Sequence, residues 1–186
     1  MKILLIFILL IPTLGHANFM FQYGLNYSSQ KDATSGNDYE ANRTFHKAFL
    51  GASVNGRKTL FLGWNTHSWT SSVTKSSVED TYSMTEMGPR LLYFFSDDYN
   101  TYISADWNPY AVGTRNKSSS SRDIRGSSMD FALGYRFKVT RYLGLGAGIH
   151  YHILTLSEEK IGTTETSSSD KITNLMPMLE FTLITR

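Results

Sequence analysis

Three histidines and a glutamate are the residue types from which a metal or catalytic site could be built. His150 and His152 are separated by one residue, so on a β-strand both side chains lie on the same face. Such a His-x-His pair can supply half of a transition-metal site, because neutral imidazole is a common ligand of Zn²⁺. His67 and Glu180 are further candidates if the fold brings their strands together. The alternative is that His67, His150 and His152 fill a polar interior by hydrogen bonding. We assign no catalytic residue, metal ligand or cofactor on this pattern alone.

Serine and histidine also occur side by side, which raises the question of acyl-transfer chemistry. A serine hydroxyl becomes a nucleophile when a histidine accepts its proton. His67 and Ser68 are adjacent in the sequence, and neighbours on a strand point to opposite faces. This pair therefore does not predict a nucleophilic site by itself.

The element that must position these residues is a strand of the kind seen from Met129 to Val139. Its odd-numbered residues are all apolar, and its even-numbered residues are small or charged. This period of two predicts a β-strand with two unlike faces. Eleven residues are about the length of one tilted transmembrane strand.

The same alternation predicts seven further strands, and so an eight-stranded antiparallel up-and-down β-barrel. The Asn55-Gly56 turn between two alternating runs is a strong hairpin signal. The connections between the strands alternate long, short, long. The three short turns and both termini then fall at one end of the barrel, and the four long polar loops fall at the other, as in bacterial outer-membrane barrels. The predicted strands cover residues 19–28, 45–54, 60–67, 84–95, 101–113, 129–139, 143–153 and 174–183.

The N-terminus predicts export. Lys2 is followed by an unbroken apolar run from Ile3 to Ile11, and Gly15 and Ala17 suit a cleavage site. We expect residues 1–17 to be a signal peptide and 18–186 to form the barrel. The chain has no cysteine, which excludes disulfides and thiolate chemistry, and its formal net charge of +2 gives no reason to expect a nucleic-acid partner.

The charges on the less apolar faces indicate which face is inside. A soluble barrel would turn its apolar faces inward around a ligand. A membrane barrel would turn them toward lipid and enclose the charges, which must then be paired because a buried charge is costly. The inward set is balanced, as a closed lumen requires, and we favour the membrane barrel. The predicted lumen network consists of Lys47, Glu86, Arg90, Asp106, Asp130, Arg136, Lys138 and Glu180.

With this pattern the chain resembles the small eight-stranded outer-membrane barrels, such as the OmpA transmembrane domain, OmpX and OmpW. The resemblance covers Phe19 to Arg186 and rests on the strand pattern. It implies a monomer in the bacterial outer membrane whose partners are outer-membrane lipid, lipopolysaccharide and the barrel-assembly machinery. One departure concerns the C-terminus, where such barrels commonly end in an aromatic residue. This chain ends in Arg186, and its last aromatic residue is Phe181.

The resemblance implies a structural or surface-interaction role, with two alternatives. An OmpW-like barrel would be a narrow channel for small solutes. A lipid A deacylase would be an enzyme, and those enzymes carry a His-x-Ser pair on one lipid-facing strand. Here His67-Ser68 and His150-Tyr151-His152 depart from that pattern. We therefore expect a non-enzymatic barrel with a charged lumen.

Overall fold

The computed structural model describes residues 17–32, 39–75, 78–117, 120–162 and 164–185. The predicted signal peptide thus lies almost entirely outside the described residues. No helix long and apolar enough to cross a membrane occurs in the part of the chain that is described. The strands are β1 (Phe19–Asp32), β2 (Tyr39–Ser53), β3 (Leu60–Lys75), β4 (Val78–Phe94), β5 (Thr101–Lys117), β6 (Ser120–Lys138), β7 (Leu143–Ile161), β8 (Thr164–Ser167) and β9 (Lys171–Ile184).

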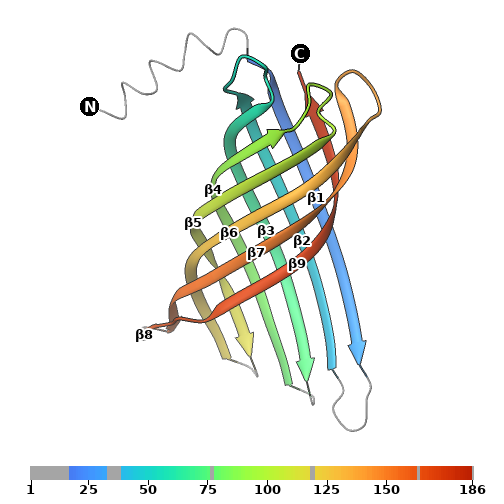
Figure 1. The fold of residues 1–186 in the computed structure, drawn as a ribbon. Helices are drawn as coiled ribbons and strands as arrows, with labels where there is room; N and C mark the ends of the chain where they lie inside the picture. Colours follow the sequence, from blue (N-terminus) through green and yellow to red (C-terminus); the bar gives the residue numbers. More distant parts are fainter. Residues whose placement is uncertain (1–16, 33–38, 76–77, 118–119, 163, 186) are drawn as a thin grey trace, which may run out of the picture.

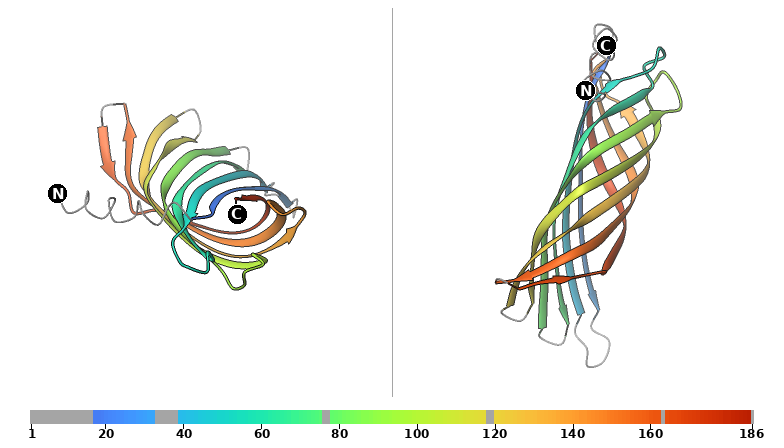
Figure 2. Two further views of the ribbon diagram at one scale, coloured as in Figure 1. Left: turned by 90° about the horizontal axis from the view of Figure 1, so that it is seen from above. Right: turned by 90° about the vertical axis from the view of Figure 1, so that its left-hand side faces the viewer.

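Eight of these strands close into an antiparallel barrel (Figures 1 and 2). Each strand from β1 to β7 pairs with the next, β7 also pairs with β9, and β9 pairs with β1. The short β8 pairs with the outer end of β7 and lies outside the ring. Because the sheet closes on itself, the ring has no free edge strand. The predicted eight-stranded antiparallel barrel is confirmed.

The two ends of the barrel differ in their connections (Figure 1). The start of β1 lies beside the end of β9, where Met20 pairs with Ile184. The turns 54–59, 95–100 and 139–142 lie at this same end, which we call the terminal end. The opposite end carries the hairpins β1–β2, β3–β4 and β5–β6 and the β7–β8 segment, and we call it the hairpin end.

The polar stretches predicted as long loops at the hairpin end are largely strand. The stretch from Thr114 to Ser128 is one example, because β5 and β6 remain paired up to Lys117 and Ser120. Pairing satisfies the backbone hydrogen bonds of such segments. The stretch from Thr70 to Asp80, which was expected to be able to extend its strand, is also paired, up to Lys75 and Val78. The barrel wall therefore continues well past the apolar strand segments. Residues 33–38, 76–77, 118–119 and 163 lie outside the described part.

The apolar faces point outward. Along β6, the odd-numbered residues from Met129 to Val139 are exposed, whereas Asp130 and Arg136 are buried. The same holds around the ring, where the exposed side chains form an apolar band. This arrangement contradicts a soluble barrel that encloses a ligand with its apolar faces. The band includes Phe21, Leu25, Leu50, Leu62, Leu91, Ile103, Leu133, Leu145, Ile149, Leu175 and Leu179.

One predicted face is wrong because β5 contains a bulge. Simple alternation predicted Ala111 on the outside and Tyr110 inside. The structure buries Ala111 and exposes Tyr110. Between the pairs Asn108–Ser128 and Ala111–Gly126, β5 has one residue more than β6, and an extra residue reverses the faces beyond it. Pro109 sits in this bulge, where the ladder needs no N–H donor.

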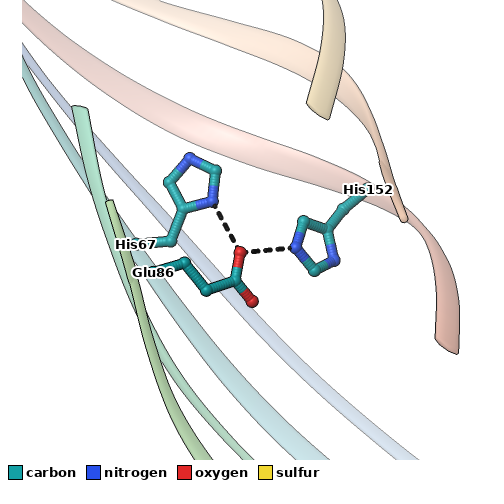
Figure 3. A group of neighbouring side chains, drawn as sticks. All are labelled: His67, Glu86 and His152. Atoms are coloured by element: carbon teal, nitrogen blue, oxygen red, sulfur yellow. Dashed lines mark hydrogen bonds and ion pairs between the residues drawn. The ribbon is translucent and has the colours of Figure 1, made fainter. Parts of the chain in front are cut away.

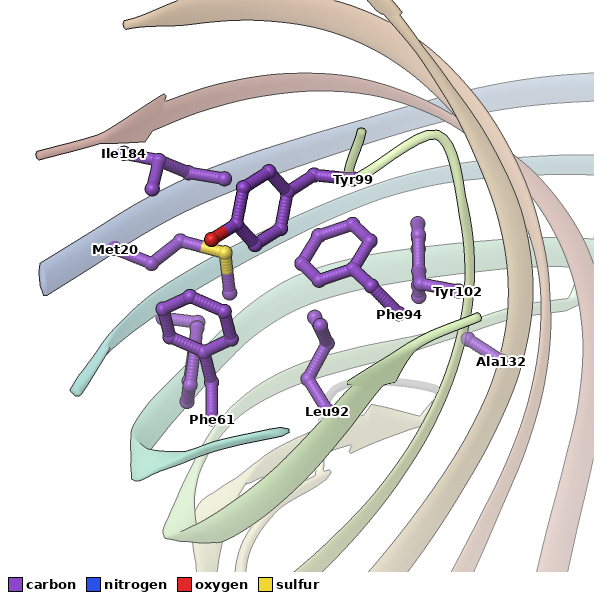
Figure 4. Packing of buried hydrophobic residues seen from close by; sticks show 9 residues of the cluster. Met20, Phe61, Leu92, Phe94, Tyr99, Tyr102, Ala132 and Ile184 are labelled. Carbon is purple, nitrogen blue, oxygen red and sulfur yellow. The ribbon is translucent and has the colours of Figure 1, made fainter. Parts of the chain in front are cut away.

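The barrel interior is filled by side chains in layers. An apolar layer near the terminal end includes Met20, Phe61, Phe94 and Tyr99 (Figure 4). The ring of Phe94 packs edge to face with the rings of Phe61 and Tyr99. We call it the terminal-end cluster; its other members are Phe49, Leu92, Tyr102, Ala132 and Ile184. A second layer, the hairpin-end cluster, consists of Phe45, Trp69, Met84, Ala111, Ile124, Leu154, Leu156, Met176 and Met178. Polar residues occupy the space between the two clusters.

Candidate functional site

The polar residues between the two apolar clusters form a buried site with contributions from most of the barrel strands. Its charged and imidazole side chains are almost inaccessible to solvent, with exposures of 0 to 6%. Each lies on the inward face because it follows the period of two of its strand. The members are Lys47 on β2, His67 on β3, Glu86 and Arg90 on β4, Asp106 on β5, Asp130 on β6, His150 and His152 on β7, and Glu180 on β9.

Lys47 lies at the centre of the charges. Its Nζ is 2.5 Å from Asp106 Oδ2 and 2.5 Å from Asp130 Oδ1. Asp106 also pairs with Arg90, whose Nε is 3.2 Å from Oδ1. Arg90 also donates a hydrogen bond from Nη2 to Ser104 Oγ at 3.0 Å, and its guanidinium lies 5.0 Å from the ring centroid of Phe49. Two acids and two bases are thus paired directly, which offsets the cost of burying them.

His150 connects this group to Glu180. Its Nδ1 is 2.9 Å from Asp130 Oδ1, and its Nε2 is 3.0 Å from Glu180 Oε1. A neutral imidazole has a single N–H, so this ring donates to both carboxylates only when it is protonated. Tyr102 Oη and Gln22 Nε2 donate to Glu180 as well, at 2.5 and 3.1 Å.

His67, Glu86 and His152 form the most compact group (Figure 3). Glu86 Oε2 is 3.3 Å from His67 Nδ1 and 2.9 Å from His152 Nε2. One ligand atom from each residue can be chosen so that all three lie within 4.8 Å of one another. Two further donors approach the same carboxylate, because Trp69 Nε1 bonds Oε1 at 2.6 Å and Ser128 Oγ bonds Oε2 at 2.5 Å.

The structure divides the predicted histidine cluster. His67 and His152 meet at Glu86, with their ring centroids 5.9 Å apart. His150 lies instead between Asp130 and Glu180. His67 remains connected to the central charges, since its Nε2 is 3.3 Å from Asp106 Oδ2.

Two of the basic residues predicted for the lumen network, Lys138 and Arg136, lie outside the buried site described above. Lys138 is 36% exposed, and its Nζ is 3.6 Å from the exposed Asp98. It follows the inward pattern of β6, but it is the last residue of that strand, where the interior meets solvent. Its assignment to the buried network is therefore corrected. Arg136 is buried closer to the terminal end and donates from Nη1 to the carbonyl of Tyr99 at 3.4 Å.

Several members of the site were absent from the sequence-based network. Trp69, Tyr102, Asn108 and Ser128 all contribute hydrogen bonds to it. Strand alternation already placed Tyr102 and Asn108 on the inward face, but their partners lie on other strands. Only the register between strands brings them together. His67 and Ser68 lie on opposite faces, His67 buried and Ser68 exposed, as expected.

A second charged group lies at the hairpin end, beyond the apolar band. Arg115 binds both carboxylate oxygens of Asp80 at 3.1 and 2.8 Å. Its guanidinium also lies 5.0 Å from the ring centroid of Tyr82. Burial raises the pKa of Tyr82 to about 12, and the hydrogen bond from Arg115 to Asp80 raises the pKa of the guanidinium. Arg122 and Glu159 extend the group through a contact of 2.8 Å.

Comparisons with known proteins identify the architecture. No protein-family model matches the sequence, and no curated protein matches it either. Among solved structures, the chain is similar to Neisserial surface protein A (NspA), with a TM-score of 0.51 and 11% identity over 90% of this chain and 97% of that one. The chain has the fold of an outer-membrane β-barrel.

Two autotransporter domains are also similar at lower scores. They are the translocator domain of NalP from Neisseria meningitidis and the β domain of the Bordetella autotransporter BrkA. The first has a TM-score of 0.43 and 12% identity over 96% of this chain and 66% of that one. The second has a TM-score of 0.46 and 11% identity over 89% and 69%.

The chemistry open to the buried site follows from its enclosure. Apolar clusters lie on both sides of it along the barrel axis, and its groups are shielded from solvent. The functional groups of this site are therefore not exposed to a substrate dissolved in water or lipid. The site is suited to holding charges, protons or an ion in fixed positions.

Proposed function

We propose that the protein is a monomeric integral barrel of a bacterial outer membrane, exported with a cleaved signal peptide of residues 1–17. Its proposed role is structural or interactive, without catalysis or open transport. The observation that carries this proposal is the apolar band on the outside of a barrel whose interior is charged.

The band has the composition that a lipid environment requires. A water-soluble monomer rarely exposes a contiguous apolar patch larger than a few hundred Å², whereas here nearly every barrel strand exposes several large apolar side chains. Aromatic residues lie toward both borders, with Tyr27 and Tyr110 toward the hairpin end and Phe95, Phe137 and Tyr142 at the terminal end. Such girdles are typical of membrane barrels, where the rings lie at the level of the lipid headgroups.

The filled interior argues against an open channel. Eight strands enclose a space that side chains can fill, and here two apolar clusters lie along the axis with paired charges between them. Opening a water-filled path would require moving both clusters and breaking several buried ion pairs. This favours a closed barrel over the alternative of a channel for small solutes.

The hairpin end offers the surface through which an interactive role would operate. Its strands continue past the band as polar hairpins, with the ion pairs of Arg115 and Arg122 at the barrel mouth. In an outer membrane this end would face outward, as the longer connections of bacterial barrels do. Lipopolysaccharide and external molecules are the partners within its reach.

Membrane fractionation combined with a heat-modifiability gel tests the proposal. Expressed with its native leader in a Gram-negative host, the protein should fractionate with the outer membrane and lose the leader. Unboiled samples should migrate differently from boiled samples, because a folded barrel resists detergent until it is heated. A soluble periplasmic product without a shift on boiling would contradict the proposal.

A further inference from the structure

One carboxylate oxygen in the barrel interior is approached by two imidazole nitrogens. Glu86 Oε2 is 3.3 Å from His67 Nδ1 and 2.9 Å from His152 Nε2, and all three side chains are fully buried (Figure 3). Two histidines and one carboxylate are a common set of protein ligands for divalent transition metals. We infer that His67, Glu86 and His152 bind one divalent transition-metal ion, with Zn²⁺ as the representative case.

The spacing agrees with this inference. Ligand atoms about 2.0–2.1 Å from a tetrahedral Zn²⁺ lie about 3.3 Å from one another. The two separations at Glu86 Oε2, 3.3 and 2.9 Å, are close to that value, and the third separation is within 4.8 Å. Small movements of the side chains would therefore bring all three ligand atoms to coordination distance of one ion.

Both ring nitrogens of His67 face carboxylate oxygens, since Nδ1 lies 3.3 Å from Glu86 Oε2 and Nε2 lies 3.3 Å from Asp106 Oδ2. A neutral imidazole carries one N–H, so one of these nitrogens points its lone pair at a carboxylate oxygen. A cation between Nδ1 and Glu86 Oε2 removes this conflict.

The groups behind the ligands also suit a metal site. His67 Nε2 lies 3.3 Å from Asp106 Oδ2, so a proton on Nε2 would point at a carboxylate while Nδ1 binds the metal. Ligating histidines commonly donate their second nitrogen in this way, which orients the ring. Trp69 Nε1 holds the other oxygen of Glu86 at 2.6 Å, while Oε2 faces the two imidazoles and accepts a hydrogen bond from Ser128 Oγ at 2.5 Å.

The group of His67, Glu86 and His152 differs from the neighbouring His150 in the positive charge that lies beside it. Lys47 already supplies a cation beside His150, with its Nζ 3.4 Å from Nδ1. Within the described residues, Glu86 contacts two imidazoles, one indole N–H and one hydroxyl, none of which is a lysine or arginine. A divalent ion would supply the positive charge that no lysine or arginine provides at Glu86 within the described residues.

The enclosure of the site indicates that the metal enters during folding. Metal binding to a site that forms only in the folded chain adds to the stability of the folded state. The hairpin-end cluster covers this site, since Phe45 and Trp69 pack against His152 with centroids 5.3 and 6.2 Å away. A bound ion should therefore exchange slowly with a chelator in solution.

Metal retention after refolding tests the inference. The chain would be unfolded in urea with a chelator, refolded into detergent micelles with Zn²⁺, washed with chelator and analysed for bound metal. We expect one retained Zn²⁺ per chain, and heat-modifiable protein that retains no metal would overturn the inference. His152→Asn and Glu86→Gln should lose the ion. The outward-facing His46→Asn and the buried His150→Asn should keep it, and equal retention by all four variants would also overturn the inference.

A second readout needs no change to the ligands. The chain has three tryptophans, and Trp64→Phe with Trp107→Phe, both at outward positions, leaves Trp69 as the remaining one. Trp69 bonds directly to Glu86, so bound Co²⁺ should strongly quench its emission relative to Zn²⁺. Equal emission with the two metals would contradict binding at this site. Both the metal-retention test and the emission test are made on refolded protein, so their results do not depend on where the barrel is located in the cell.

Discussion

At the scale of single residues, the interior depends on one lysine that holds two carboxylates. Replacing Lys47 with methionine would keep the volume and leave Asp106 and Asp130 facing each other without that cation. Removing one partner of a buried ion pair costs about 3–5 kcal/mol. We expect Lys47→Met to lower the free energy of unfolding by that amount, measured by urea titration in lipid vesicles.

Lys138 provides the matched control for this change. It is partly exposed and pairs with an exposed aspartate, so Lys138→Met should change the free energy of unfolding by about 1 kcal/mol or less. Adding Asp130→Asn to Lys47→Met should recover part of the loss, since it removes one of the two repelling charges. Equal effects of the two lysine variants would contradict the charge arrangement described.

At the scale of single elements, β6 offers a direct test of the outward face. Leu133 is 56% exposed and lies in the middle of the apolar segment of its strand. Arginine at the midplane of a barrel in a bilayer costs about 2–4 kcal/mol, falling to about 0–1 near the interfaces. Leu133→Arg should show the larger loss and Val139→Arg, at the strand end, the smaller one. Unfolding titrations in vesicles measure both, and the reverse order would be inconsistent with lipid at Leu133.

Gly134 on the same strand tests how tightly the interior is packed. A Cβ atom at this position would lie 2.3 Å from Cε1 of the Tyr102 ring, whose hydroxyl bonds Glu180. The ring cannot yield without weakening that bond, and overpacking of this kind costs about 1–3 kcal/mol. Gly134→Ala should therefore destabilise the barrel. Gly56→Ala, where a Cβ meets nothing within 4 Å, should be nearly neutral in the same urea titration.

The elements also show what could be predicted from the sequence. Strand alternation predicted the strands and which residues share a face, and the balanced charges on the less apolar faces predicted which face points inward. It could not locate the β5 bulge at Pro109, since an inserted residue leaves both neighbouring runs alternating. The polar hairpins were predicted as loops because serine and threonine are common in both loops and strands.

The contacts within the candidate site could not be predicted from the sequence, for a different reason. His67, Glu86 and His152 were each expected inside the barrel, yet their meeting depends on the strand registers and on the diameter of the closed ring. Lys138 was expected there too, and only its place at the strand end put it beside Asp98. Local patterns specify the face of a residue, whereas its partner is a property of the assembled barrel.

At the scale of the whole molecule, the filled interior predicts that the barrel does not conduct. Both apolar clusters and the ion pairs between them would have to move before ions could pass. Refolded protein added to a planar lipid bilayer should give no discrete current steps under an applied voltage. Reproducible steps of constant conductance would support the channel alternative instead. Protein recovered from the bilayer should still show the heat shift of a folded barrel.

The central claim is that the apolar face of every strand meets lipid, and β6 allows the most direct measurement of it. Because the chain has no cysteine, single cysteines can be introduced from Met129 to Val139 and labelled with a nitroxide in vesicles. We predict a period of two in accessibility to dissolved oxygen, which concentrates in lipid, with maxima at Phe131, Leu133, Tyr135 and Phe137. Maxima at the even-numbered positions, or no period of two, would contradict the claim.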